Sequence, residues 1–157
     1  MSSPATYQHQ DSAQTLEEGI AEYYAKHPSL VKGRGISEEA REFFRCHDAA
    51  HVLFGCRDSL ADEAAVKISS IFGTTGGFGV LRGYRLRESQ DIYRTLGLGE
   101  QVATALLSVI LVPRTILRCL RMRRRWPWRD HARYLNVPLR DLRREFGVRV
   151  AQSSRRA

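Results

Sequence analysis

Paired cysteines, long apolar runs and the residue pattern of a signal peptide are missing from these 157 residues. The three cysteines are an odd number without the spacing of a disulfide framework, which favours a reducing compartment. The polar first fourteen residues contain neither a basic start nor an apolar stretch, and the longest uncharged stretch, 101–113, is too short to span a bilayer. We therefore expect a cytoplasmic protein without a membrane-spanning helix.

Strand-like alternation of apolar and polar residues is also missing, whereas apolar residues recur at helical spacing. With 43% hydrophobic residues, the chain can build one compact, multi-helix, all-α domain. We expect this domain over residues 15–150, between disordered segments at 1–14 and 151–157. Five glycines between Gly73 and Gly83 predict a mobile loop or lid. The predicted helices cover residues 17–26, 37–55, 59–72, 87–98, 99–125 with a bend at Pro113, and a short segment from Pro138 to Gly147.

Acidic residues are absent from 101–129, although the chain as a whole carries a formal net charge of +8. Seven arginines lie in the second half of this segment, mixed with aliphatic residues and two tryptophans. This mixture favours peripheral contact with an anionic membrane surface, and a solvated charged face is the alternative. Nucleic acid is not an expected partner, because no helix-turn-helix or RRM pattern accompanies the charge. The expected membrane-contact residues are Arg114, Arg118, Arg121, Arg123, Arg124, Arg125, Trp126 and Trp128.

Two histidines occupy the apolar stripe of the predicted helix 37–55. His47 and His51 are four residues apart, which places them about 40° apart around a helix and turns both toward the interior. Asp48 lies about 60° round from His51, and Glu63 arrives from the first turn of the next helix. Imidazoles and carboxylates are ligands of zinc, and also of iron and manganese. The sequence therefore predicts a divalent-metal site, with zinc as the first choice, between two consecutive helices.

The role of Asp48 has two interpretations, because it can bind the metal or orient a histidine from behind. Its presence after His47 also separates this pattern from the H-E-x-x-H metalloproteases, in which a glutamate is the general base at that position. Cys46 is turned about 100° from His47, so we expect it to pack as a small hydrophobe. Without a metal, His47 and His51 would be buried neutral histidines hydrogen-bonded to the two carboxylates.

The pattern His47-Asp48-x-x-His51-x(11)-Glu63 resembles the metal-ligand motif of the Coq4 family of ubiquinone biosynthesis proteins. Further similarities are Gly55 after the second histidine, Ala64 to Lys67 after the glutamate, and the segments Trp126 to Trp128 and Val137 to Val148. The resemblance implies an all-helical protein that acts at a membrane surface on a polyprenylated benzoate or quinone precursor. The implied activity is a metal-dependent oxidative decarboxylation at ring carbon C1, together with the organisation of other quinone-biosynthesis proteins. The implied metal ligands are His47, Asp48, His51 and Glu63.

Two other functions compete with this one. An HD-type metal-dependent phosphohydrolase would use His27, His47, Asp48 and Asp91, and would leave His51 and Glu63 without a role. A non-catalytic scaffold that binds isoprenoid lipid would use the same four ligands for a structural metal. The sequence leaves the oligomeric state open, including a homo-oligomer.

Overall fold

The computed structural model describes residues 4–28, 37–84 and 98–150, and the named elements within them are all helical, which confirms the all-α class. No strand occurs among these residues. The predicted helix 87–98 and the predicted tail 151–157 lie outside the described residues, apart from Leu98. The elements are η1 (Thr6–Gln8), α1 (Leu16–Lys26), α2 (Glu38–Phe54), α3 (Leu60–Phe72), η3 (Gly77–Gly79), α4 (Val80–Tyr84), α6 (Leu98–Leu120), η4 (His131–Tyr134) and α7 (Leu139–Phe146).

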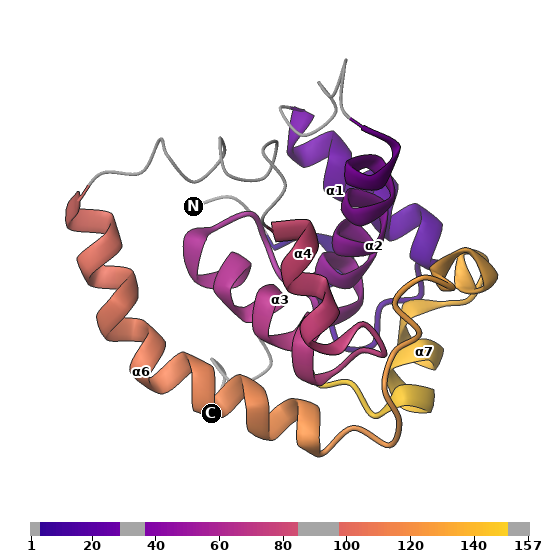
Figure 1. Cartoon of the computed structure of the whole chain (residues 1–157). Coiled ribbons are helices and arrows are strands. Elements are labelled where there is room, and N and C mark those ends of the chain that lie inside the picture. Colours follow the sequence, from indigo (N-terminus) through magenta and orange to yellow (C-terminus); the bar gives the residue numbers. More distant parts are fainter. Residues whose placement is uncertain (1–3, 29–36, 85–97, 151–157) are drawn as a thin grey trace.

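Helix α2 is the centre of the fold. It packs against α1, α3, α4 and α7, while α3 packs on its other side against α6. Figure 1 shows α6 as an outer arc that curves around α3, with α7 at the opposite edge of the molecule. Because neighbours surround α2, every residue from Cys46 to Phe54 is buried. The two predicted histidines therefore lie inside the protein.

The ends of α2 are the ones that the sequence predicts. The Ser37 side chain accepts a hydrogen bond from the backbone N–H of Ala40 and caps the first turn. Gly55 ends the helix at a φ of 69°, a left-handed conformation that favours glycine. In the same way, the Ser59 side chain accepts from the N–H of Asp62 at the start of α3. Local capping chemistry thus sets the register of the two helices that carry the predicted ligands.

The N-terminal segment corrects the prediction of disorder over 1–14 for its described residues, 4–14. Tyr7 is only 1% exposed, and its hydroxyl donates a hydrogen bond to the carbonyl of Cys56 at 3.1 Å. Its ring meets the ring of Tyr23 edge-on, with 6.0 Å between the centroids. The polar composition of the segment hides this role, because a single aromatic anchor and several backbone carbonyls are enough to hold it in place.

The glycine-rich segment forms η3 and α4, so the predicted loop is a pair of short helical turns. Its start is tied down by two backbone hydrogen bonds of 2.8 Å, from the N–H of Thr75 to the carbonyl of Trp126 and from the N–H of Trp126 to the carbonyl of Gly73. A Cβ at Gly83 would lie 1.9 Å from the Cδ2 atom of Phe43, so this glycine is needed for close packing of α4 on α2. The missing side chain of Gly83 therefore lets the backbone of α4 contact the ring of Phe43.

The tryptophans also differ from the sequence prediction, because neither reaches the surface. Helix α6 ends at Leu120, and the following segment turns Trp126 and Trp128 inward, leaving them 0% and 6% exposed. The Trp126 ring packs against Tyr134 and Phe146 at centroid distances of 5.0 and 5.1 Å. They are core residues, so the prediction that they contact a membrane is wrong. Pro113 lies inside α6, and none of the described helices has the length and apolarity to span a membrane.

Arg143 of α7 is a buried cation that joins three parts of the chain. It is 1% exposed, and its guanidinium donates to the carbonyls of Val52 at 2.8 Å and Leu53 at 2.9 Å, near the end of α2. It also donates to the carbonyls of Tyr7 at 2.6 Å and His9 at 2.5 Å. Burial lowers its pKa to about 10. The planar fork of donors supplies hydrogen bonds to the last carbonyls of α2 and to the N-terminal segment at the same time.

We expect Arg143→Leu to lower the free energy of unfolding by about 3 kcal/mol or more, because it removes the buried donors that join α7 to the carbonyls of α2 and of the N-terminal segment. Arg143→Lys should recover only part of the loss, since an ammonium cannot reproduce the fork. The matched control is Arg144→Leu on the same helix, whose side chain is 75% exposed and which should change stability by less than about 0.5 kcal/mol. Urea denaturation measures all three, and equal effects at positions 143 and 144 would contradict the anchoring role.

Candidate metal centre

Three of the four predicted ligands come together between α2 and α3. His47 and His51 each offer a ring nitrogen and Glu63 offers a carboxylate oxygen, and these atoms all lie within 4.8 Å of one another. The i, i+4 spacing on α2 stacks the two imidazoles on one face, and α3 delivers Glu63 from its first turn. The predicted meeting of two consecutive helices at one site is therefore confirmed, and the three side chains can hold a metal ion.

The Glu63 carboxylate faces both imidazoles at once. The Nε2 atom of His51 lies 3.0 Å from Oε1, and the Nε2 atom of His47 lies 3.5 Å from Oε2. His51 is 0% exposed and His47 is 7% exposed. Despite the short distances, neither Nε2 atom has the alignment of a hydrogen bond, so both are buried polar atoms without a hydrogen-bond partner. Two buried nitrogens that converge on one carboxylate are an arrangement that could hold a divalent ion.

Asp48 is not a member of this group of three. Its Oδ1 atom lies 3.3 Å from Nδ1 of His47, on the far side of the ring from Glu63, and its Oδ2 atom accepts a hydrogen bond from the Tyr24 hydroxyl at 2.7 Å. Because adjacent helical residues point about 100° apart, Asp48 reaches the edge of its neighbour's ring and not the space between the imidazoles. Of its two predicted roles, the geometry matches orientation of His47 from behind.

The charges of the cluster favour an ionised carboxylate. Burial opposes the charged form of Glu63, but contacts with His47 and His51 outweigh it and hold its pKa well below the usual range. Burial likewise opposes the charged form of His47, but contacts with Asp48 and Glu63 raise its pKa to about 9. Without a metal, a proton on His47 balances the two carboxylates beside it. A divalent cation supplies the same compensation with more charge.

Aromatic rings enclose the two histidines, and sequence reasoning missed them as parts of the site. Tyr23 of α1 stacks on His51 with 5.1 Å between ring centroids. Phe43 of α2 and Tyr84 of α4 pack on His47 at 5.7 and 5.6 Å. The side chain of Glu63, at 21% exposure, is the member of the cluster that is most open to solvent. The contact between Phe43 and His47 could have been predicted from the sequence, because residues four apart lie on the same face of a helix.

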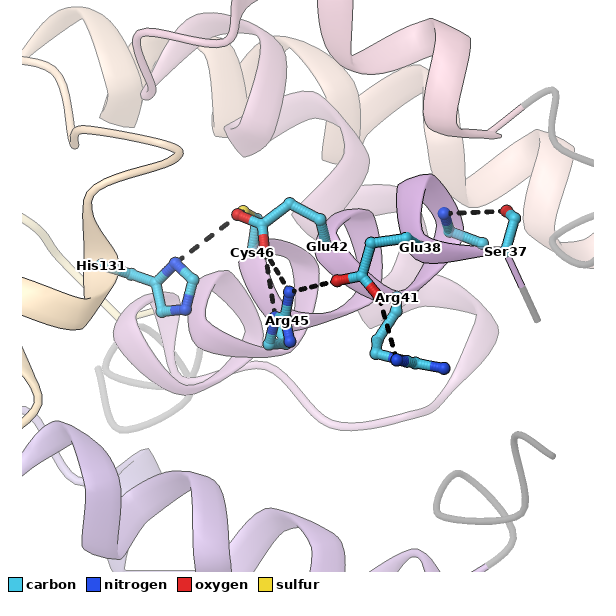
Figure 2. A network of polar contacts seen from close by, with 8 residues as sticks. Ser37, Glu38, Arg41, Glu42, Arg45, Cys46 and His131 are labelled. Atoms are coloured by element: carbon cyan, nitrogen blue, oxygen red, sulfur yellow. Dashed lines mark hydrogen bonds and ion pairs between the residues drawn. The ribbon is translucent and has the colours of Figure 1, made fainter. Parts of the chain in front are cut away.

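Cys46 lies outside the cluster, as the sequence predicts from its position on α2. Its Sγ atom is 3.6 Å from Oε1 of Glu42 and 3.8 Å from Nδ1 of His131, in the network that Figure 2 shows. Burial raises the pKa of its thiol to about 12, so it stays protonated. It is a packed residue of the α2 surface that faces His131.

His27, which the phosphohydrolase interpretation requires, is also outside the cluster. Its Nδ1 atom pairs with Oδ2 of Asp58 at 2.7 Å, and its ring packs on Tyr23. Asp91 lies outside the described residues. The described part of the chain therefore brings together His51 and Glu63, the two residues that this interpretation leaves without a role.

Comparison with protein-family models, with curated proteins and with solved structures finds no match for this chain. The fold and the site define a class by themselves, an all-helical protein with two histidines and one carboxylate gathered between its central helices. In proteins, this donor set holds zinc or iron and leaves positions open for water or substrate.

We expect the purified protein to bind about one divalent ion per chain, and His51→Ala and Glu63→Gln to abolish this binding. Asp48→Asn should keep the ion but weaken its affinity about 10- to 100-fold, because it disturbs only the orientation of His47. His9→Ala, which removes an exposed imidazole, is the matched control and should bind like the unmodified protein.

Elemental analysis and competition with a chelator measure these affinities, and circular dichroism checks that each variant is folded. Binding that is lost equally in Asp48→Asn and Glu63→Gln would place Asp48 among the ligands. Unchanged binding in both Glu63→Gln and His51→Ala would remove the metal centre.

Proposed function

We propose that this protein is a metal-dependent enzyme of quinone biosynthesis, which catalyses oxidative decarboxylation at ring carbon C1 of a polyprenylated benzoate precursor. In this reaction the bond between the ring and the carboxyl carbon breaks with release of CO2, a hydroxyl group from water takes its place, and dioxygen accepts the two electrons and is reduced to hydrogen peroxide. The observation that carries the proposal is the convergence of His47, His51 and Glu63 within 4.8 Å. The motif that these residues form with Asp48 supports the substrate class, because its spacing resembles that of quinone-biosynthesis proteins. The proposal includes a second role in organising partner enzymes of that pathway.

The residues around the cluster have separate tasks in this proposal. When bound, a divalent ion supplies a Lewis acid for the oxygen atoms of the substrate. His47, His51 and Glu63 hold the ion, and Asp48 keeps the Nε2 atom of His47 directed at it. The aromatic rings limit the access of water, which strengthens electrostatic interactions at the site. Zinc, iron and manganese all suit the donor set.

A hydrophobic substrate of this kind resides in a membrane, and the outer face of α6 supports contact with one. Val109, Ile110, Leu117 and Leu120 are 72%, 71%, 52% and 68% exposed, which is unusual for large apolar side chains on one helix. Exposed arginines accompany them, and no acidic residue occurs between positions 101 and 129. We propose that this face, and not the two tryptophans, rests on an anionic membrane surface. The exposed arginines among the expected contact residues are Arg114, Arg121, Arg123, Arg124 and Arg125.

Two of the expected membrane-contact arginines interact with other parts of the protein. Arg118 is partly buried, and burial together with the neighbouring Arg114 lowers its pKa. Arg124 forms an ion pair with Glu145 of α7. The membrane proposal therefore depends most on Arg114, Arg121, Arg123 and the apolar residues between them.

The function is tested in a bacterial strain that cannot make quinone and accumulates C1-carboxylated intermediates. We expect the unmodified chain to restore quinone and remove these intermediates, whereas folded His51→Ala and Glu63→Gln leave them in place because the metal is lost. Glu39→Gln, an exposed carboxylate on α2, is the control and should restore quinone fully. Restoration of quinone by metal-free His51→Ala would show a scaffold and not an enzyme.

Membrane contact is tested with vesicles. We expect the double variant Arg114→Gln/Arg121→Gln to bind vesicles that contain anionic lipid at least tenfold more weakly, since each arginine near such a surface contributes about 1 kcal/mol. Leu117→Gln/Leu120→Gln, which removes apolar surface without adding charge, should weaken binding to anionic and neutral vesicles alike. Arg140→Gln/Arg144→Gln on α7 is the charge-matched control, and a loss of binding as large as that of the α6 pair would contradict the assignment of this face.

A further inference from the structure

Lys67 lies one helical turn after Glu63 on α3, so both side chains leave the helix on the same face. Its Nζ atom is 4.8 Å from the centroid of the Tyr84 ring. The Tyr84 ring in turn packs on the ring of His47, with 5.6 Å between centroids. The ammonium group and the metal-binding cluster therefore border the same aromatic ring.

The ammonium group of Lys67 has no ion-pair partner in the described part of the chain. Lys26, by comparison, pairs with Glu22 at 3.8 Å. Lys67 is also partly buried, which makes an uncompensated positive charge more costly than at the surface. The Tyr84 ring offers weak compensation through its π face. An anion bound at the ammonium group would complete it.

The charge of the loaded site points to the same conclusion. The carboxylates of Glu63 and Asp48 balance the charge of a divalent ion held by two neutral imidazoles, and Lys67 brings the local total to +1. Phe43 and Tyr84 meet edge-on at 5.0 Å and add an aromatic wall beside His47. A ligand that satisfies all of these features has a carboxylate on an aromatic ring.

From this arrangement we propose that Lys67 binds the carboxylate of an aromatic acid beside the metal, and so selects carboxylated substrates over neutral ones. This inference rests on the proposed function and assigns a residue to substrate recognition. The ammonium group acts as a point charge on one carboxylate oxygen. His47, His51 and Glu63 remain the metal ligands.

The test uses the full chain loaded with cobalt(II), whose visible spectrum reports a change in its ligands. 4-Hydroxybenzoate is the probe, and 4-hydroxybenzamide is its neutral counterpart of similar shape. We expect Lys67→Met, which keeps an apolar stem on Tyr84, to weaken 4-hydroxybenzoate at least about tenfold and to leave both the cobalt content and the affinity for the amide unchanged. Lys67→Arg should restore most of the affinity, and Lys26→Met is the matched control with no effect.

The outcomes separate the two proposals. Equal affinity of Lys67→Met and the unmodified protein for 4-hydroxybenzoate would overturn the role of Lys67 and leave the metal centre intact. Equal losses for the acid and the amide, or loss of cobalt in both Lys67 variants, would make Lys67 a structural residue and also overturn the inference. Failure of the unmodified protein to bind cobalt would instead count against the proposed function.

Discussion

The buried guanidinium of Arg143 is the interaction on which the position of α2 depends. It draws the carbonyls of Val52 and Leu53 and the N-terminal segment onto α7, and it does so without a carboxylate partner at ion-pair distance among the described residues. Gly55 closes the same end of the helix, where the N–H of Cys56 donates to the carbonyl of His51 at 2.9 Å. These contacts fix the C-terminal end of α2, within about one turn of His51.

The two sides of the candidate metal centre differ in their contacts and in their exposure to solvent. On the inner side, Asp48 and Tyr24 hold His47 through a chain of hydrogen bonds, and Tyr23 covers His51. On the outer side, Glu63 is partly open to solvent, and Lys67 follows it along α3. Rigid ligands on a buried helix and an accessible face on its neighbour are what a site needs to hold an ion and still receive a ligand.

Helix α3 links this site to the outer surface of the protein. It carries Glu63 toward α2 and packs its other side against α6, whose outer face exposes apolar and basic side chains. A surface that rests on lipid and a site that takes an amphipathic aromatic acid would then be separated by the thickness of one helix. This short path supports the proposal that the substrate enters from a membrane.

The sequence by itself determined the helical class, the bounds of α2 and the pairing of His47 and His51 with Glu63, because capping residues and helical periodicity are local properties. Contacts between segments that are distant in the sequence could not be predicted from these local patterns. Only the tertiary structure decided that Trp126 and Trp128 face the core, that residues 4–14 are packed, and that Asp48 supports His47 from behind. It also brought Tyr84 between Lys67 and the cluster. Composition describes what a segment contains, but burial depends on which partner arrives from elsewhere in the chain.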